Sequence, residues 1–230
     1  MKCNDKLQKN LKNGLKRPEI IFAVHMNLWY NHIIIREEIK TMNRLIPGTS
    51  MKFSEQARDS AFSVISPVLE ATGGLTLSQL SKLTGLEGTT IQNWIKRGWV
   101  SATKGKKYSE KQIIRILLIN MLRKAMKLEE IANLMRYING DVEDTSDDII
   151  EDILLYNILC RIIFTAEDEG AFDTEHIKTL VSRELADYSK EVKDIDKLRK
   201  AMYVMVMGYR SGCLRTEMEK GLEIILEEMQ

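Results

Sequence analysis

The sequence predicts a mostly α-helical protein. Apolar residues recur at three- and four-residue spacing along most of the chain, which is the helical period. Only three of the 230 residues are proline and 29% are charged, a composition that favours helices over a sandwich of strands. With 44% hydrophobic residues, the chain can also form a core of ordinary size.

We expect four regions along the chain. They are an N-terminal extension of undetermined structure, a linker, a compact central module and a helical C-terminal domain, which span residues 1–52, 53–74, 75–140 and 141–230. The linker carries a short helix over Phe53 to Leu69 and ends at Gly73–Gly74. Met42 and Met51 are candidate start sites, so the sequence leaves open whether residues 1–50 belong to the native structure.

Formal charge is distributed unevenly over these regions. The net charge is +4 over residues 1–74, +8 over residues 75–140 and −11 over residues 141–230. A basic middle next to an acidic tail predicts a module that binds a polyanion, joined to a domain with another task. Chance clustering of solvated charges is the alternative explanation.

The sequence indicates neither secretion nor a membrane span. The apolar stretch Ile20–Val24 is too short to cross a bilayer, and no small-residue cleavage site follows it. The three cysteines, Cys3, Cys160 and Cys213, are far apart and odd in number, so they form neither a disulfide framework nor a zinc spacing. We therefore expect a cytoplasmic protein.

The central module is predicted to begin with two helices joined by a tight turn. Thr76 and Gln79 fit a capping box, and the first helix carries its apolar residues on one face, at Leu77, Leu80 and Leu83. Gly85 can take the positive φ that the turn needs. The second helix runs from about Gly88 to Lys96 and stops at Gly98.

A wing and two further helices are expected to complete the module. Val100 to Tyr108 fits a strand, a turn with Gly105 at its tip, and a second strand. Ser109 and Gln112 form another capping box, which opens the apolar helix Ile113 to Leu122. The last helix has apolar residues at helical spacing and ends at a glycine, with the members Leu128, Ile131, Leu134, Met135 and Gly140.

The C-terminal region is predicted to be entirely helical. Its first helix begins at Ser146, where Asp147 and Asp148 favour the positive end of the helix dipole, and it continues to Phe164. The other two helices span Asp173 to Tyr188 and Asp194 to Gln230.

The second helix of the module carries the candidate binding residues. Its polar residues are spaced i, i+3, i+4, i+7 and form one stripe, made of Thr89, Gln92, Asn93 and Lys96. Ile91, Trp94 and Ile95 lie on the opposite face, toward the first helix. Hydroxyl, amide and ammonium groups suit the major groove of DNA, because Asn and Gln can bond adenine in a bidentate way. An ordinary surface helix has the same spacing, so the stripe alone does not decide the function.

These elements, in this order, resemble the DNA-binding head of MerR-type regulators. The runs that carry the resemblance are Leu77–Leu86, Ile91–Trp94, Arg97–Val100, Lys107–Ser109 and Leu128–Ile131. The resemblance implies a winged helix-turn-helix that binds double-stranded DNA as a dimer. The expected contact residues are Thr89, Thr90, Gln92, Asn93, Lys96, Arg97, Lys104, Lys106 and Lys107. MerR heads usually have Arg and Tyr where this chain has Gln92 and Asn93, and Arg where it has Lys106.

A second resemblance is more specific to this sequence. The runs Gly74–Gln79 and Thr90–Val100 resemble a bacterial group, the domain of unknown function family 1836. Tyr137–Gly140 and Asp147–Ile150 extend the similarity, which covers about residues 62–156.

Together these patterns predict a DNA-binding transcriptional regulator that forms a homodimer through its helical C-terminal region. The alternative is a protein-interaction adaptor that uses the same fold without reading DNA. We do not expect an enzyme, a metal or a cofactor, because His25, His32 and His176 stand apart from cysteines and paired carboxylates. No glycine-rich phosphate loop is present either. The operator, the effector and the direction of regulation are not predicted.

Overall fold

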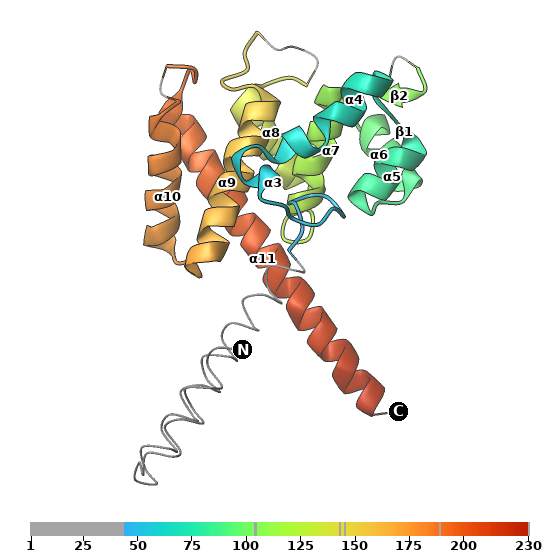
Figure 1. Ribbon diagram of the computed structural model, residues 1–230, viewed down its shortest axis with the longest axis vertical. Helices are drawn as coiled ribbons and strands as arrows, with labels where there is room; N and C mark the ends of the chain where they lie inside the picture. Colours follow the sequence, from blue (N-terminus) through green and yellow to red (C-terminus); the bar gives the residue numbers. More distant parts are fainter. Residues whose placement is uncertain (1–43, 104, 143, 145, 189, 230) are drawn as a thin grey trace, which may run out of the picture. The chain divides into compact units, whose positions relative to one another are not determined.

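The computed structural model describes residues 44–103, 105–142, 144, 146–188 and 190–229. The chain divides into two units, residues 1–44 and 45–230, and all the described helices and strands belong to the second unit. The expectations for residues 1–43 and for Lys104 therefore lie outside the described residues. The second unit is mostly helical, as predicted, with one two-stranded sheet in its described part (Figure 1).

The region before the central module contains three short helical pieces. They are α3 (Gln56–Asp59), the 3₁₀ helix η1 (Ala61–Val64) and α4 (Ser66–Thr72). A single helix over Phe53 to Leu69 was predicted, and this is wrong. Ser60 interrupts it with an extended backbone, and its side chain accepts a hydrogen bond from the Ser63 N–H.

The two helices at the start of the module lie where the sequence predicts them. They are α5 (Leu77–Thr84) and α6 (Gly88–Lys96). The capping box is present, since the Thr76 N–H donates to Gln79 Oε1 at 2.9 Å. Gly85 ends α5 with a φ of 69°, which confirms the predicted turn.

The sheet differs from the predicted wing. A strand–turn–strand was expected within Val100 to Tyr108, but residues 101–103 are not strand, and β2 (Lys107–Tyr108) pairs instead with β1 (Leu75–Thr76). The ladder is antiparallel and joins the segment before α5 to the segment before α7. A distant strand thus satisfies the backbone groups of β2.

Helices α7 (Glu110–Leu122) and α8 (Leu128–Asn139) follow as predicted. The next helix, α9 (Asp152–Glu169), was expected to start at Ser146, and this is wrong. Buried Asn139 holds the segment before α9 in a non-helical form. Its Oδ1 accepts from the Ile149 N–H at 3.2 Å, and its Nδ2 donates to the Ile150 carbonyl at 2.7 Å.

Helices α10 (Thr174–Ala186) and α11 (Ile195–Glu228) complete the unit. Each begins with an aspartate cap at the predicted position: Asp173 accepts from the His176 N–H, and Asp194 from the Lys197 N–H. The first half of α11 packs in the core. From residue 217 its second half is almost fully exposed and runs out from the other helices of the unit (Figure 1).

The core is centred on α7. Ten of its 13 residues are buried, including Ile113, Ile116 and Leu117, which are completely inaccessible. Helix α7 packs against four other helices, α5, α8, α9 and α11. A single hydrophobic core therefore extends from the central module into the C-terminal helices.

A turn over residues 45–52 joins the end of α5 to this core. The Ser50 N–H donates to the Leu83 carbonyl at 2.8 Å. Asn120 Nδ2, from α7, donates to the carbonyls of both Gly48 and Thr84 at 2.9 Å. The turn thus links the α5–α6 turn to α7 through ordered hydrogen bonds.

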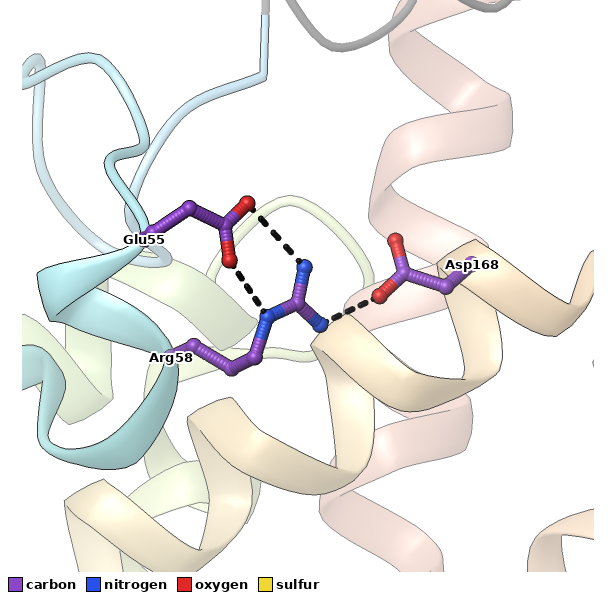
Figure 2. A network of polar contacts seen from close by, with 3 residues as sticks. All are labelled: Glu55, Arg58 and Asp168. Carbon is purple, nitrogen blue, oxygen red and sulfur yellow. Dashed lines mark hydrogen bonds and ion pairs between the residues drawn. The ribbon is translucent and has the colours of Figure 1, made fainter.

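Arg58 links α3 to the end of α9 (Figure 2). Its Nε donates to Glu55 Oε2 at 2.9 Å, and its Nη1 donates to Asp168 Oδ2. These two hydrogen bonds raise the pKa of Arg58, so the guanidinium stays charged. Because the side chains are partly exposed, we regard this pair of bonds as positioning α3 more than as stabilising the fold.

Burial of Trp94 predicts a large effect of its removal. Trp94 is 2% exposed, as expected from the sequence, and it packs in the core below α6. Trp94→Ala should lower the free energy of unfolding by roughly 3–5 kcal/mol, measured by urea denaturation. Lys96→Ala, an exposed substitution in the same helix, should change it by less than about 0.5 kcal/mol. Equal effects of the two would contradict the orientation of α6.

Candidate nucleic-acid interface

Helix α6 separates an apolar face from a polar one. Ile91 and Trp94 point into the core, and Ile95 is half-buried against it. The polar stripe is on the exposed side, with its members Thr89, Gln92, Asn93 and Lys96 all accessible to solvent. The α6 hydrogen-bonding groups are therefore available to a ligand along the length of the helix.

A groove of about 630 Å³ runs between α6 and the start of α8. Its lining residues are Thr90, Asn93, Trp94, Arg97, Trp99, Lys127, Leu128 and Glu129. It brings together three predicted site residues, Thr90, Asn93 and Arg97. Thr89, Gln92 and Lys96 do not line it and stay on the open surface of α6.

Five of the residues that line this groove were not among the predicted contacts, and two of these five, Trp99 and Lys127, add to its binding chemistry. Trp99 stacks below Arg97, whose guanidinium carbon lies 5.2 Å from the indole ring centre. Such a cation–π contact restricts the arginine side chain while leaving its N–H groups outward. Lys127 comes from the segment that caps α8, and it reaches the groove because α8 begins beside α6. No local pattern in the sequence links residue 127 to residue 97.

The charge of the groove is mixed. Arg97 and Lys127 are balanced in part by Glu129, which also lines it. Glu130 caps the start of its own helix, because its Oε2 accepts a hydrogen bond from the Lys127 N–H at 2.8 Å. Among its lining side chains, the positive charge of the groove comes from Arg97 and Lys127.

The two described wing lysines differ in how freely their ammonium groups can move. Lys106 is exposed and precedes β2. Lys107 pairs with Thr76 in the ladder, and its ammonium donates to the Thr72 carbonyl. Of these two ammonium groups, that of Lys106 is therefore the more available to a ligand.

A buried arginine supports the segment that follows α6. Arg115, in α7, is 7% exposed, and its Nε donates to the Trp99 carbonyl at 3.4 Å. Burial lowers the pKa of Arg115, while Asp152 and Asp148 oppose this shift. Gln112 lies one turn before Arg115 in α7, and its Nε2 donates to the Ser101 carbonyl at 2.8 Å. These two contacts fix the backbone around Trp99. The sequence did not indicate this role of Arg115, because the residue lies within an apolar run.

The other candidate chemistries give no competing site in the described part of the chain. His176 pairs with Glu169, with 2.5 Å between Nε2 and Oε2. Burial raises the pKa of the Cys160 and Cys213 thiols, which disfavours reactive thiolates. Within the described ranges, no group of three His, Cys, Asp or Glu side chains is placed to hold a metal ion. None of the helices there is both long and apolar enough to cross a membrane.

A family model matches the part of the chain that contains the groove and the helices around it. Residues 64–159 match the family model described as Domain of unknown function (DUF1836). This range includes α5 to α8, the two strands and the first part of α9, and it confirms the second resemblance predicted from the sequence. The groove lies entirely inside it.

A protein of similar sequence exists in Bacillus subtilis (strain 168). This is "Uncharacterized protein YkrK", which is 29% identical over 119 residues. The aligned part is 50% of this chain and 50% of that protein, so the chain spans about half the length of the curated relative it matches. No solved structure matches this chain.

The glycine pair before β1 offers a test of how the sheet positions the module. Gly74 has a φ of 119°, and a Cβ there would lie 2.5 Å from the Tyr108 carbonyl oxygen. Gly74→Ala should therefore disrupt the β1–β2 ladder and lower the free energy of unfolding by roughly 3 kcal/mol. Gly73→Ala is the matched control, since a Cβ there meets nothing within 4 Å. It should cost only the left-handed strain, about 1–2 kcal/mol. Chemical unfolding of both variants checks the difference, and a larger loss for Gly73→Ala would contradict it.

Proposed function

We propose that this protein is a DNA-binding transcriptional regulator whose residues 75–140 act as a MerR-like winged helix-turn-helix. In this proposal α5 and α6 are the helix-turn-helix, and α6 enters the major groove of double-stranded DNA. The segment from Val100 to Tyr108 is the wing. Two heads in a dimer read two half-sites.

The observation that carries the proposal is the two-faced character of α6. A helix that inserts into the major groove must be held on one side by its own domain and free on the other. Ile91 and Trp94 hold α6 in the core, and the exposed face offers two amide side chains, Gln92 and Asn93. Amides form the bidentate bonds to adenine that read sequence.

Cationic side chains flank this face and suit the phosphate backbone. Lys96 is exposed in the last turn of α6, and Arg97 is oriented by its contact with Trp99. Residues 75–140 carry a net charge of +8, which favours association with a polyanion of any sequence. The acidic C-terminal region adds no attraction for DNA, so its apolar surfaces are assigned to the dimer.

Selection of bound sequences from a pool of random duplexes is the direct test. The full chain should enrich a common sequence, and binding should weaken steeply as salt rises. Failure to bind any duplex at low salt would overturn the proposal. In that outcome the protein-interaction adaptor becomes the better explanation of the exposed α6 face.

The wing lysine should contribute affinity without specificity. Lys106→Ala should weaken binding to all duplexes alike and reduce the slope of log affinity against log salt by about 0.9, the value for one phosphate contact. Lys107→Ala should have the smaller effect, because its ammonium donates to the Thr72 carbonyl. Lys200→Ala, an exposed lysine of α11, is the control and should leave the slope unchanged. Fluorescence anisotropy at several salt concentrations measures all three.

The amide at the centre of α6 should contribute specificity. Asn93→Ala should cost about 1–3 kcal/mol on the selected sequence and leave binding to random DNA nearly unchanged. The salt slope should stay the same, since no charge is removed. Asn133→Ala, an exposed amide of α8, should change neither binding mode. If Asn93→Ala leaves specific binding intact, α6 does not read bases.

A further inference from the structure

The second half of α11 carries an apolar stripe that the described part of the chain leaves uncovered. Seven large apolar side chains in this half are between 49% and 77% exposed. Ile224 lies on another side of the helix, and the other six make up the stripe, which consists of Leu214, Met218, Leu222, Ile225, Leu226 and Met229. By contrast, the first half of the same helix buries its apolar residues in the core. The stripe is thus a continuous apolar surface on the part of α11 that extends beyond the other helices of the unit.

A helix in this situation is not expected to be stable by itself. Isolated helices of about 15 residues are marginal in water, because tertiary packing supplies most of their stability. Gly221 lies in the middle of this half and lowers its helix propensity by about 1 kcal/mol relative to alanine. A Cβ at Gly221 would meet nothing within 4 Å, so no contact in the described part of this chain requires the glycine.

We propose that this stripe is a self-association surface, on which α11 of a second copy packs antiparallel over residues 214–229. Met218, Leu222, Ile225 and Met229 follow one another at intervals of four, three and four residues, which is the spacing of a coiled-coil seam. The proposal does not depend on DNA binding, although a DNA-binding dimer would use it.

An antiparallel pair centred between Gly221 and Leu222 matches most of the stripe to itself, while Leu226 comes opposite the partner's Glu217. In this register Leu214 faces Met229 of the partner, Met218 faces the partner's Ile225, and Leu222 faces the partner's Gly221. The glycine then provides the space into which the leucine of the other copy fits. Such self-complementarity about a two-fold axis is the property of an isologous interface, and a foreign partner would not require it.

Charge selects the antiparallel direction. The tip of α11 is acidic, with Glu223, Glu227 and Glu228, whereas its base combines Arg215, Lys220 and the neighbouring Lys124 with Glu217 and Glu219. Lys124 Nζ donates to Thr216 Oγ1 at 3.2 Å, which places this ammonium at the start of the exposed half. An antiparallel partner brings its acidic tip to this base of nearly balanced charge, and Glu228 comes opposite Arg215, which also pairs with Glu219 of its own helix. A parallel partner would place the two acidic tips together.

The mass of the full chain without DNA tests this surface. Sedimentation at micromolar concentration should give twice the chain mass of 26.5 kDa. Because the stripe is smaller than the 20–30 residues per side of a standard interface, dilution should shift the mass toward the monomer. Leu222→Glu with Ile225→Glu should weaken association roughly a hundredfold, by placing four carboxylates in the seam.

Lys220→Glu is the matched control, because it adds a carboxylate on the polar face of α11. It should remain dimeric. A monomer at all concentrations would overturn the proposal and point to residues 1–43 or another protein as the occupant of the stripe. A dimer that the double variant leaves intact would also overturn it. Since no DNA is present, neither result bears on the DNA-binding test.

Cross-linking tests the direction, with Cys3 and Cys213 replaced by Ser so that the only remaining native thiol is buried Cys160. Leu222→Cys should form a disulfide with itself in the dimer, because position 222 lies at the centre of the register. Glu228→Cys alone should not, but a mixture of Glu228→Cys and Arg215→Cys chains should give the mixed disulfide. A disulfide formed by Glu228→Cys alone would show parallel packing and overturn the proposed register.

Discussion

The burial of α7 on nearly all sides is the constraint on which the rest of the unit depends. A helix with one apolar stripe can lie at a surface, but α7 has apolar residues around its whole circumference and must be enclosed. Helices α5, α8, α9 and α11 supply that enclosure. The orientation of α6 follows from it, because α6 rests on α5 and its position is set by how α5 packs against α7.

Polar groups within this enclosure fix its details. Asn120 on α7 holds the carbonyls of Gly48 and Thr84. Asn139 at the end of α8 holds the backbone that leads into α9. Both amides bond backbone groups of distant segments, so a shift of either segment would leave polar atoms without these partners. The exposed face of α6, which we propose reads DNA, therefore rests on a core whose neighbouring segments are fixed by hydrogen bonds.

Local features of the structure were predictable from the sequence, and long-range ones were not. The boundaries of α5 and α6, the Thr76–Gln79 capping box and the burial of Trp94 depend on residues within a few positions of one another. The partner of β2 lies about thirty residues earlier, and the start of α9 depends on Asn139, so no local pattern indicated either.

The candidate site shows the same division. The polar stripe of α6 could be predicted from the sequence, since helical spacing alone places its members on one side of the helix. The roles of Arg115 and Lys127 were not, because they arise where α7 and α8 pass beside the segment after α6. Lys107 was predicted as a contact residue, but the sequence did not indicate that its ammonium donates to the Thr72 carbonyl, because this contact depends on the β1–β2 pairing.

The turn over residues 45–52 also bears on how such a protein can change in evolution. Tyr156, in α9, donates its hydroxyl hydrogen to the Pro47 carbonyl at 2.7 Å, so this turn contacts both the module and the helix after it. A recombination event that moved only residues 75–140 into another chain would cut these bonds and expose the side of α7 that faces α9. The module is therefore poorly suited to shuffling by itself, and we expect α5 to α8 to be inherited together with α9 and the turn.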